Sequence, residues 1–535
     1  MDTIGHRLRA LATEHGTHPA LLSGLDDEVV TFADLAADAR RVAAALAGLG
    51  VSKGTRVGIL MPNRPDWLRV AFGAWRLGAI VVPLNTLYRA PELSHALRHA
   101  DVTVLITVSR FLRNDYAAML TTLCPEIARP ETHLASETMP SLRHVVWQGE
   151  DVPPGAMAWE DFLALSEAMS PAWARAALES VDPTDDATIF FTSGSTAAPK
   201  GVVHTHASML AAADNVADRL GLEAADRTYG YLPLFFNGGL VGVCLATLSR
   251  GGAVVLQEAF EPGETLRLLE RHGCTTMFAW PHQADALVQH PDFDRAKLKL
   301  RKGPGGSARW AATLLQPDHQ AVGTWGMTET GPMASSTRYD DPPAMRAGAN
   351  GRPMPGFEMR IVDPESNRVL PPGEEGEITV RGASLMRTYY RRAPADCFDA
   401  EGFFHTGDCG HIDQGGLLHF VGRIRDVIKT AGVNVAAAEV EAVLMAHPDV
   451  KAALVVPVPH PTRGENVAAF IVPQNPRCDA ETLLAHCQAN LATYKVPRFL
   501  FFTAEDELPT LGSGKIDRRR LSERAAALAG QTPAH

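Results

Sequence analysis

Helix-like and strand-like segments alternate along the first part of this chain, and this alternation constrains the fold more than any other feature. Residues Phe32–Gly50 carry apolar side chains at helical spacing, and the apolar run Arg56–Met61 that follows has the length of a buried strand. A second helical segment, Trp67–Ala79, precedes two more apolar runs, Ile80–Asn85 and Val102–Thr107. Strands that alternate with helices pair in parallel, and the helices cover the sheet. The pattern therefore predicts an α/β fold with parallel-rich sheets covered by helices.

The sequence pattern changes after Asp408. Residues Gly410–Val435 read as short strands joined by glycine turns. Residues Ala437–His447 read as an amphipathic helix that stops before Pro448. This pattern of short strands and an amphipathic helix predicts a small α+β domain at the C-terminal end.

The chain has 535 residues, which is too many for one ordinary hydrophobic core. We expect an N-terminal domain over residues 1–422, a hinge at 423–426 and a mobile C-terminal domain over 427–535. The proline-rich segment Thr122–Pro154 has little regular patterning, so we expect it to form an irregular excursion on the surface.

The segment at 190–201, FFTSGSTAAPKG, places small hydroxylated residues, a glycine and a lysine after an apolar run. The backbone N–H groups and hydroxyls of such a loop can converge on one oxyanion, Gly194 permits close backbone approach, and Lys200 adds a cation. It is not a Walker loop, because Pro199 and Gly201 stand where that motif needs glycine and serine or threonine. We predict a phosphate-binding loop. A polar surface turn is the alternative that the residues alone leave open.

A second polar segment, TWGMTETG at Thr324–Gly331, suits a nucleotide site. Trp325 could stack on a base and Thr328 could bond a phosphate. Glu329 could hold Mg²⁺, a hard cation that prefers carboxylate and phosphate oxygens. An ordinary strand followed by a turn is the alternative.

Five segments together resemble the motifs of adenylate-forming enzymes, the superfamily of acyl-CoA synthetases, firefly luciferase and peptide-synthetase adenylation domains. The predicted phosphate loop is similar to TSGTTGxPKG, with Ser195 and Ala197 as departures, and TWGMTE is similar to YGxTE. FHTGD (Phe404–Asp408) resembles YxTGD, the segment Gly422–Glu441 resembles the hinge motif GRxKDxIKxxGxNIxxxEIE, and Leu508–Arg518 resembles LPxTxxGKIxR. The resemblance covers almost the whole chain. It implies a small β-barrel-like subdomain within the large N-terminal domain.

The resemblance implies an ATP site. The glycine-rich segment Gly303–Ser307 would lie along the adenine, Asp408 would accept hydrogen bonds from both ribose hydroxyls, and Arg423 would contact the ribose. The implied ATP-binding residues are Thr192, Ser193, Gly194, Ser195, Thr196, Lys200, Gly305, Gly306, Ser307, Thr324, Trp325, Gly326, Met327, Thr328, Asp408, Phe420, Arg423 and Lys515.

The resemblance also assigns catalytic roles. Lys515, on a glycine-rich loop, would reach the active site only when the C-terminal domain closes, and Arg425 would be the hinge residue. Without the family, both would be read as solvated surface charges. Glu329 is the implied metal ligand, and Lys429 and Gly432 are the implied CoA-binding residues. The implied catalytic residues are Lys515, Glu329, Thr328 and Lys200.

An apolar acyl pocket is implied by the segment YLPLFFNGGL. Many acyl-CoA synthetases have histidine where this chain has Phe236, so we expect a larger apolar wall at that position. The segment Met277–Val288 matches a pocket-lining helix in which Trp280 would limit the depth, although plain core packing is the alternative. The expected acyl-pocket residues are Phe235, Phe236, Asn237, Trp280 and Met327.

These observations predict an AMP-forming acyl-CoA synthetase that resembles fatty-acid–CoA ligases. It would use ATP, Mg²⁺ and coenzyme A to convert a fatty or other apolar or cyclic carboxylic acid to an acyl-adenylate and then to an acyl-CoA. An enzyme that loads a carrier-protein thiol is one alternative, and a non-catalytic protein that binds acyl-adenylate is another. The sequence leaves a homodimer open.

Charge, cysteine content and hydropathy argue against nucleic-acid-binding, disulfide-bonded and membrane-spanning classes of protein. A formal net charge of −11 argues against general nucleic-acid binding. The seven cysteines are scattered without a CxxC motif, as expected of reduced thiols. The N-terminus lacks the apolar core of a signal peptide, and the most apolar stretch, Gly238–Leu248, is too short to span a bilayer. We therefore expect a cytoplasmic enzyme without a transmembrane segment.

Overall fold

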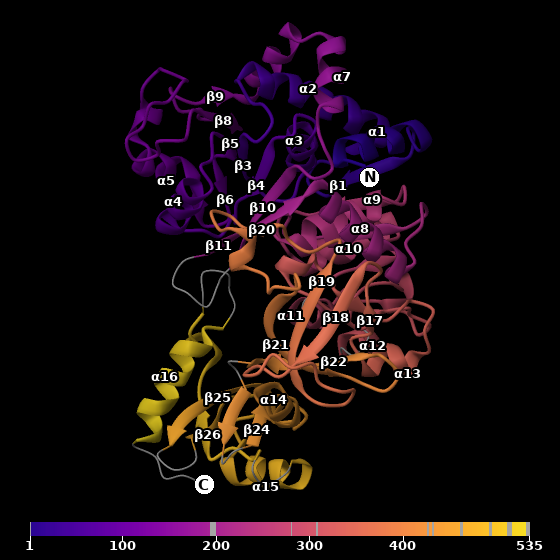
Figure 1. Ribbon diagram of the computed structural model, residues 1–535, viewed down its shortest axis with the longest axis vertical. Helices are drawn as coiled ribbons and strands as arrows, with labels where there is room; N and C mark the ends of the chain where they lie inside the picture. Colours follow the sequence, from indigo (N-terminus) through magenta and orange to yellow (C-terminus); the bar gives the residue numbers. More distant parts are fainter. Residues whose placement is uncertain are drawn as a thin grey trace. The chain divides into compact units, whose positions relative to one another are not determined.

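The computed structural model describes residues 2–192, 199–279, 281–305, 309–424, 427–430, 433–460, 464–491, 495–510 and 516–530 (Figure 1). The chain divides into two compact units. The first is formed by Met1–Met359 and Val380–Phe404, and the second by Arg360–Thr379 and His405–His535.

The first unit contains an eight-stranded sheet in the order β20-β11-β10-β4-β3-β5-β8-β9. Its central strands pair in parallel, whereas β11 pairs antiparallel with β10 and with β20. The sheet is therefore mixed. Its strands are β3 (Arg56–Leu60), β4 (Ile80–Pro83), β5 (Val104–Val108), β8 (His144–Gln148), β9 (Met157–Ala158), β10 (Asp186–Thr192), β11 (Lys200–Thr205) and β20 (Thr388–Tyr389).

The helix α3 (Pro65–Trp75) packs against β3 and β4 of this sheet, and α2 (Phe32–Gly48) packs against α3 (Figure 1). Thr31 and Asp34 form a capping box that starts α2, and a proline at the first position starts α3. The predicted helices and the predicted strands that became β3, β4 and β5 are confirmed. The predicted irregular excursion is wrong at β8, which pairs in parallel with β5 and buries Val145, Val146 and Trp147.

A second sheet of this unit has five strands in the order β14-β12-β13-β1-β2. It packs over a core that includes Val255, Leu269 and Leu287. The predicted helix at Met277–Val288 is shorter than expected, because Met277 ends a strand and the helix begins at Pro281. The strands are β1 (Pro19–Ser23), β2 (Val29–Thr31), β12 (Arg227–Gly230), β13 (Ala253–Leu256) and β14 (Thr276–Met277).

The remaining elements of the first unit are short strands and peripheral helices. The strands are β6 (Arg110–Phe111), β7 (Asn114–Asp115), β15 (Thr324–Trp325), β16 (Ser335–Ser336) and β17 (Arg352–Pro353). The α-helices are α1 (Ile4–Glu14), α4 (Ala90–His99), α5 (Tyr116–Leu123), α6 (Trp159–Ala164), α7 (Pro171–Glu179), α8 (His206–Leu220), α9 (Ala246–Leu248), α10 (Pro262–His272), α11 (Pro281–Val288), α12 (Arg309–Leu314) and α13 (Pro343–Gly348). Other helical turns are η1 (Pro125–Ala128), η2 (Leu165–Ala168), η3 (Gly238–Leu245), η4 (Arg295–Lys297), η5 (Thr328–Thr330) and η6 (Pro394–Asp396).

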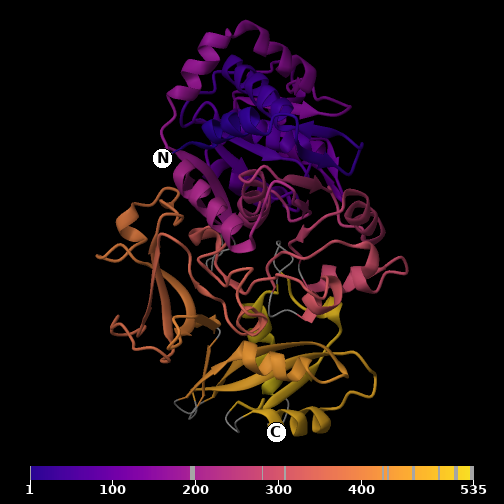
Figure 2. The ribbon, with the colours of Figure 1, turned by 90° about the vertical axis from the view of Figure 1, so that its right-hand side faces the viewer.

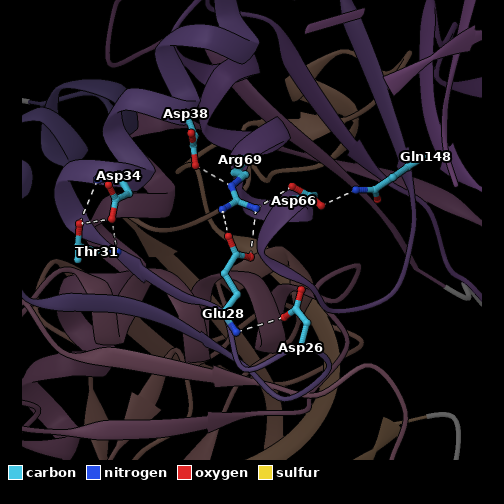
Figure 3. A network of polar contacts seen from close by, with 8 residues as sticks. All are labelled: Asp26, Glu28, Thr31, Asp34, Asp38, Asp66, Arg69 and Gln148. Carbon is cyan, nitrogen blue, oxygen red and sulfur yellow. Dashed lines mark hydrogen bonds and ion pairs between the residues drawn. The ribbon is translucent and has the colours of Figure 1, made fainter. Parts of the chain in front are cut away.

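A polar network around Arg69 joins elements from both sheets of the first unit (Figure 3). The guanidinium of Arg69, on α3, contacts Glu28 next to β2, Asp38 on α2 and Asp66 on its own helix, at 2.5, 2.7 and 2.8 Å. Gln148, at the end of β8, donates to Asp66. One cation thus links the loop before β2 in one sheet to β8 in the other.

The second unit contains a sheet in which β24, β23, β26 and β25 are consecutive and β27 pairs with β26. Alternate residues of β25 point to opposite faces: Val455 packs in the core with α14 and α15, and Val456 packs in the core with α16. In Figure 2 the orange α14 and the yellow α16 accordingly lie on opposite sides of this sheet. The elements are β23 (Val427–Thr430), β24 (Val433–Ala436), α14 (Ala437–Met445), β25 (Val450–His460), β26 (Gly464–Pro473), α15 (Ala480–Asn490), β27 (Phe499–Phe502), η8 (Glu505–Glu507) and α16 (Arg518–Ala529).

The strands β21 (Phe404–Ile412) and β22 (Leu418–Arg423) form an antiparallel hairpin before this sheet. The boundary between the two units falls within the strand β18 (Phe357–Val362) and again within the strand β19 (Gly376–Gly382). The α/β class with a small α+β C-terminal part is confirmed. Within the described residues, no helix combines the length and the apolar character needed to cross a membrane.

Candidate active site

The predicted phosphate loop joins the two strands of a hairpin. Thr192, the last residue of β10, pairs with Lys200, the first residue of β11. The strand after Lys200, where a Walker loop would continue as a helix, confirms that this is a different kind of loop. Four predicted residues of this loop lie outside the described residues, namely Ser193, Gly194, Ser195 and Thr196.

Tyr389 connects the two predicted charged residues of the phosphate site. It lies on β20, opposite Val202 of β11, and its ring is 5.1 Å from the Nζ atom of Lys200. Its hydroxyl donates a hydrogen bond of 2.8 Å to Oε1 of Glu329 on η5. The structure therefore brings Lys200 and Glu329 to the same aromatic side chain, although they are far apart in the sequence.

Glu329 is a buried carboxylate with few protein partners. Its exposed fraction is 9%, and the Tyr389 hydroxyl is its hydrogen-bond donor. Within the described part of the chain it has no cationic ion-pair partner, and buried charges normally are paired or bind metals. A magnesium ion bound by one carboxylate together with substrate phosphates fits this donor set.

The backbone carbonyl of Thr328 is held by two side chains. His204 Nε2 lies 2.7 Å and Asn237 Nδ2 lies 3.0 Å from this oxygen. Because a carbonyl can only accept, Nε2 of His204 must carry the proton, and Nδ1 lies 3.2 Å from the Ser208 hydroxyl oxygen. This pair fixes the backbone next to Glu329.

His204 and His206 are buried, and burial lowers the pKa of each imidazole to about 4. In the unfolded chain the pKa of histidine is about 6.5. Between about pH 4 and pH 6.5 the unfolded state therefore binds more protons than the folded state. The stability that these neutral rings contribute is complete above about pH 6.5 and is lost as the pH falls through this window.

We expect the melting temperature to fall when the pH is lowered from 7 to 5. Each ring can add up to about 1.4 kcal/mol per pH unit to the slope of the unfolding free energy. Thermal unfolding of His204→Gln and His206→Gln, measured at one scan rate across this pH range, should show a shallower dependence than the wild type. His18→Gln, at an exposed position, is the control. Equal slopes in all four proteins would contradict the prediction.

Asn63 holds the segment that leads to the predicted acyl pocket. Its Nδ2 lies 3.0, 3.1 and 3.0 Å from the carbonyl oxygens of Gly230, Tyr231 and Leu232, and its Oδ1 accepts from Leu234 N at 2.9 Å. Asn63 is buried and follows β3. One side chain therefore fixes the backbone between β12 and the pocket segment.

The pocket segment itself combines aromatic rings with a buried amide. The rings of Phe235 and Phe236 are 4.5 Å apart, and the Oδ1 atom of buried Asn237 has no hydrogen-bond partner among the described residues. The π-helix η3 follows, a rare form that is found frequently at functional sites. Gly239 is required there, because an added Cβ would lie 2.3 Å from the carbonyl oxygen of Pro233.

The predicted adenine segment forms an extended pair with the residues before β15. Pro304 bridges Val322 in parallel, and Gly305 N donates to the carbonyl of Val322 at 2.9 Å. Gly305 has a φ of 111°, which favours glycine. In the segment Thr324–Gly331, the predicted stacking residue Trp325 is only 5% exposed, so little of its ring surface is available to stack on a nucleotide base.

The other predicted residues of the segment Thr324–Gly331 are neighbours of Trp325 in the chain. Thr324 and Trp325 form β15, and the carbonyl of Thr324 accepts from Asn350 at 2.8 Å. Gly326 approaches Pro332 so closely that an added Cβ would lie 2.6 Å from its carbonyl oxygen. Met327 is the N-cap of η5, and its backbone N–H donates to the Thr330 hydroxyl at 3.0 Å.

In the second unit, the hairpin β21–β22 places the two predicted ribose contacts side by side. Asp408 and Arg423 are register partners, and Arg423 Nε lies 2.8 Å from a carboxylate oxygen of Asp408. Asp408 is buried, and Phe420 on the same hairpin is exposed. The structure thus brings Asp408 and Arg423 together within this unit.

Several predicted residues cannot be placed. Lys429 lies in β23, but its side chain is not among those described. Besides the four residues of the phosphate loop, the predicted residues outside the described ranges are Trp280, Gly306, Ser307, Arg425, Gly432 and Lys515.

Sequence reasoning missed His204 and Tyr389. His204 follows Lys200 closely in the chain, and a histidine in a buried strand was the available signal. Tyr389 gave no signal in the sequence, because its contacts depend on the register of β20 against β11, and these two strands are far apart in the chain. A residue that supports the site from a neighbouring strand is therefore found only when the pairing of the strands is known.

Comparisons with known proteins identify the family of this chain. A family model described as AMP-binding enzyme matches residues 8–390, and one described as AMP-binding enzyme C-terminal domain matches residues 439–515. The chain is 34% identical over 497 residues to the feruloyl-CoA synthase of Amycolatopsis sp., covering 91% of this chain and 92% of the relative. It is 31% identical over 532 residues to the long-chain-fatty-acid–CoA ligase of Escherichia coli O6:H1, covering 93% and 90%.

The structure is similar to that of the anthranilate CoA ligase AuaEII in complex with anthranoyl-AMP. The TM-score is 0.82 at 26% sequence identity, and the match covers 99% of this chain and 98% of the other. Both parts of the chain and nearly its full length are therefore matched. The chain belongs to the AMP-binding enzyme family and is an AMP-forming acid–CoA ligase.

Proposed function

We propose that this ligase activates an apolar or cyclic carboxylic acid, such as a fatty acid, with MgATP and transfers the acyl group to coenzyme A. The observation that carries the proposal is the arrangement of Lys200 and Glu329 on Tyr389. A lysine and a carboxylate that do not pair with each other suit a ligand that has a negative group for the lysine and a positive group for the carboxylate. A polyphosphate with its divalent cation is such a ligand.

The first half-reaction joins two anions. The acid is already ionised at neutral pH, so its carboxylate can attack the α-phosphate of ATP without a general base. Lys515 would stabilise the charge on the transferring phosphate, and Lys200 with the hydroxyls of the phosphate loop would hold the departing pyrophosphate. Mg²⁺, when bound, neutralises phosphate charge, and Glu329 would hold it. The products are acyl-adenylate and pyrophosphate.

The second half-reaction requires a different set of residues. The C-terminal domain would turn about Arg425, which withdraws Lys515 and brings Lys429 and Gly432 toward the path of CoA. The CoA thiol has a pKa of about 8.5 and loses its proton when it attacks the acyl carbonyl. The carbon–oxygen bond to the phosphate then breaks, and AMP leaves.

The acyl pocket is proposed from its apolar composition. Phe235 and Phe236 form an aromatic pair beside Asn237, and Trp280 and Met327 would complete the wall. A pocket of this composition favours apolar or cyclic acyl groups over small charged ones. We further propose a cytoplasmic location, because all seven cysteines are free.

A panel of carboxylic acids tests the proposed function. Release of AMP should depend on ATP, CoA and Mg²⁺ together, and should be fastest with medium or long fatty acids or with cyclic acids. Release of AMP with a carrier protein but not with CoA would contradict the proposed acceptor. Light scattering after size exclusion decides between a monomer and the homodimer that the sequence leaves open.

Replacing Asp408 with alanine should weaken ATP binding by about tenfold to a hundredfold, because two charge-assisted hydrogen bonds to ribose would be lost. Asp408→Asn keeps the shape of the side chain and should lie between alanine and the wild type. Calorimetry with a non-hydrolysable ATP analogue measures the affinity, and thermal unfolding checks that both variants are folded. Unchanged affinity in folded Asp408→Ala would place the ribose contact elsewhere.

A further inference from the structure

Tyr389 is held in place by the strand on which it lies. Its strand, β20, pairs antiparallel with β11 through Val202, and the next residue, Tyr390, donates its backbone N–H to the carbonyl of Gly201 at 2.7 Å. Successive side chains of a strand point to opposite faces. Tyr390 accordingly makes a different contact, in which its hydroxyl donates to Asp101 at 3.1 Å.

The phenol of Tyr389 can act only as a donor to Glu329. A carboxylate accepts hydrogen bonds, so the proton of the 2.8 Å contact belongs to the tyrosine. The hydroxyl therefore orients one oxygen of the carboxylate through this hydrogen bond.

The ring of Tyr389 makes the second contact. The Nζ atom of Lys200 lies 5.1 Å from the ring centroid, within the range of a cation–π interaction. Within the described residues Lys200 has no carboxylate partner. One side chain therefore holds the carboxylate at its hydroxyl and the cation at its ring.

We infer that Tyr389 is a positioning residue that keeps Glu329 and Lys200 apart and oriented for a divalent cation and a polyphosphate, an inference that rests on the proposed function. Without the hydroxyl, the Glu329 carboxylate loses its hydrogen-bond donor and its fixed orientation. Without the ring, the ammonium group also loses its support. Tyr389 acts through these two residues and does not itself contact the reacting atoms.

The test measures how binding of a non-hydrolysable ATP analogue depends on Mg²⁺ concentration, by calorimetry without acid or CoA. Tyr389→Phe keeps the ring and removes the hydroxyl, and should raise the Mg²⁺ concentration for half-maximal binding by about tenfold. Tyr389→Leu should in addition weaken analogue binding at saturating Mg²⁺. Tyr390→Phe, which removes the neighbouring hydroxyl, is the matched control and should resemble the wild type.

A Glu329→Gln background separates positioning from general damage. If Tyr389 acts through Glu329, Tyr389→Phe should not change the Mg²⁺ dependence further in that background, whereas an undiminished effect would overturn the inference. Equal Mg²⁺ dependence of Tyr389→Phe and Tyr390→Phe would overturn the inference and leave the proposed function unaffected. Failure of the wild type to bind the analogue would overturn the proposed function and the inference with it.

Discussion

Lys515→Ala should slow acyl-adenylate formation by about a hundredfold to a thousandfold, the range observed when one donor to a developing charge is removed. The described residues on either side of Lys515 are close together, because Thr510 and Ile516 form an antiparallel bridge and Asp517 N donates to Pro509 O at 2.8 Å. Asp517 then caps α16.

The measurement separates the two half-reactions. Pyrophosphate release reports the first, and CoA thioester formation from supplied acyl-adenylate reports the second, which should change little. Lys451→Ala, which removes an exposed lysine paired with Glu505, is the control. Adenylate formation at the wild-type rate in Lys515→Ala would show that the catalytic assignment is wrong.

Arg425→Pro should block transfer of the acyl group to CoA while acyl-adenylate and pyrophosphate are still made. The chain leaves the hairpin of β22 at Arg423 and enters another sheet at Val427, the first residue of β23. Proline fixes φ near −65° and removes a backbone N–H, so it restricts rotation at this junction. Adenylate should therefore accumulate on the enzyme.

Arg425→Ala is the matched control, because it removes the side chain without restricting the backbone. Enzyme-bound adenylate is quantified after quenching, together with the thioester yield. Equal loss of both half-reactions in folded Arg425→Pro would count against a hinge at this position. A normal thioester yield would remove the argument for domain alternation.

The sequence predicted the elements whose patterning is local. The helix α2 and the strands β3 and β4 followed from helical spacing and short apolar runs. The strand β8 was missed because prolines surround it, and its burial comes from pairing with β5. Local patterning does not contain this information.

The same limit applies to the candidate site. Motifs identified Lys200, Glu329 and Asp408, since each lies in a short run of characteristic residues. Tyr389 and His204 act through contacts with residues far away in the chain, at 5.1 Å from Lys200 and 2.7 Å from Thr328. Only the folded register brings these partners together.

The hydrogen bonds of Asn63 have a consequence for how substrate preference can change. Because its amide fixes the carbonyls of Gly230, Tyr231 and Leu232, the backbone entering the pocket segment is set by a residue outside the pocket. Substitutions at Phe235 and Phe236 would then alter the wall of the proposed acyl pocket without moving the chain that carries them. Libraries for a new acid should vary these two positions and keep Asn63 constant.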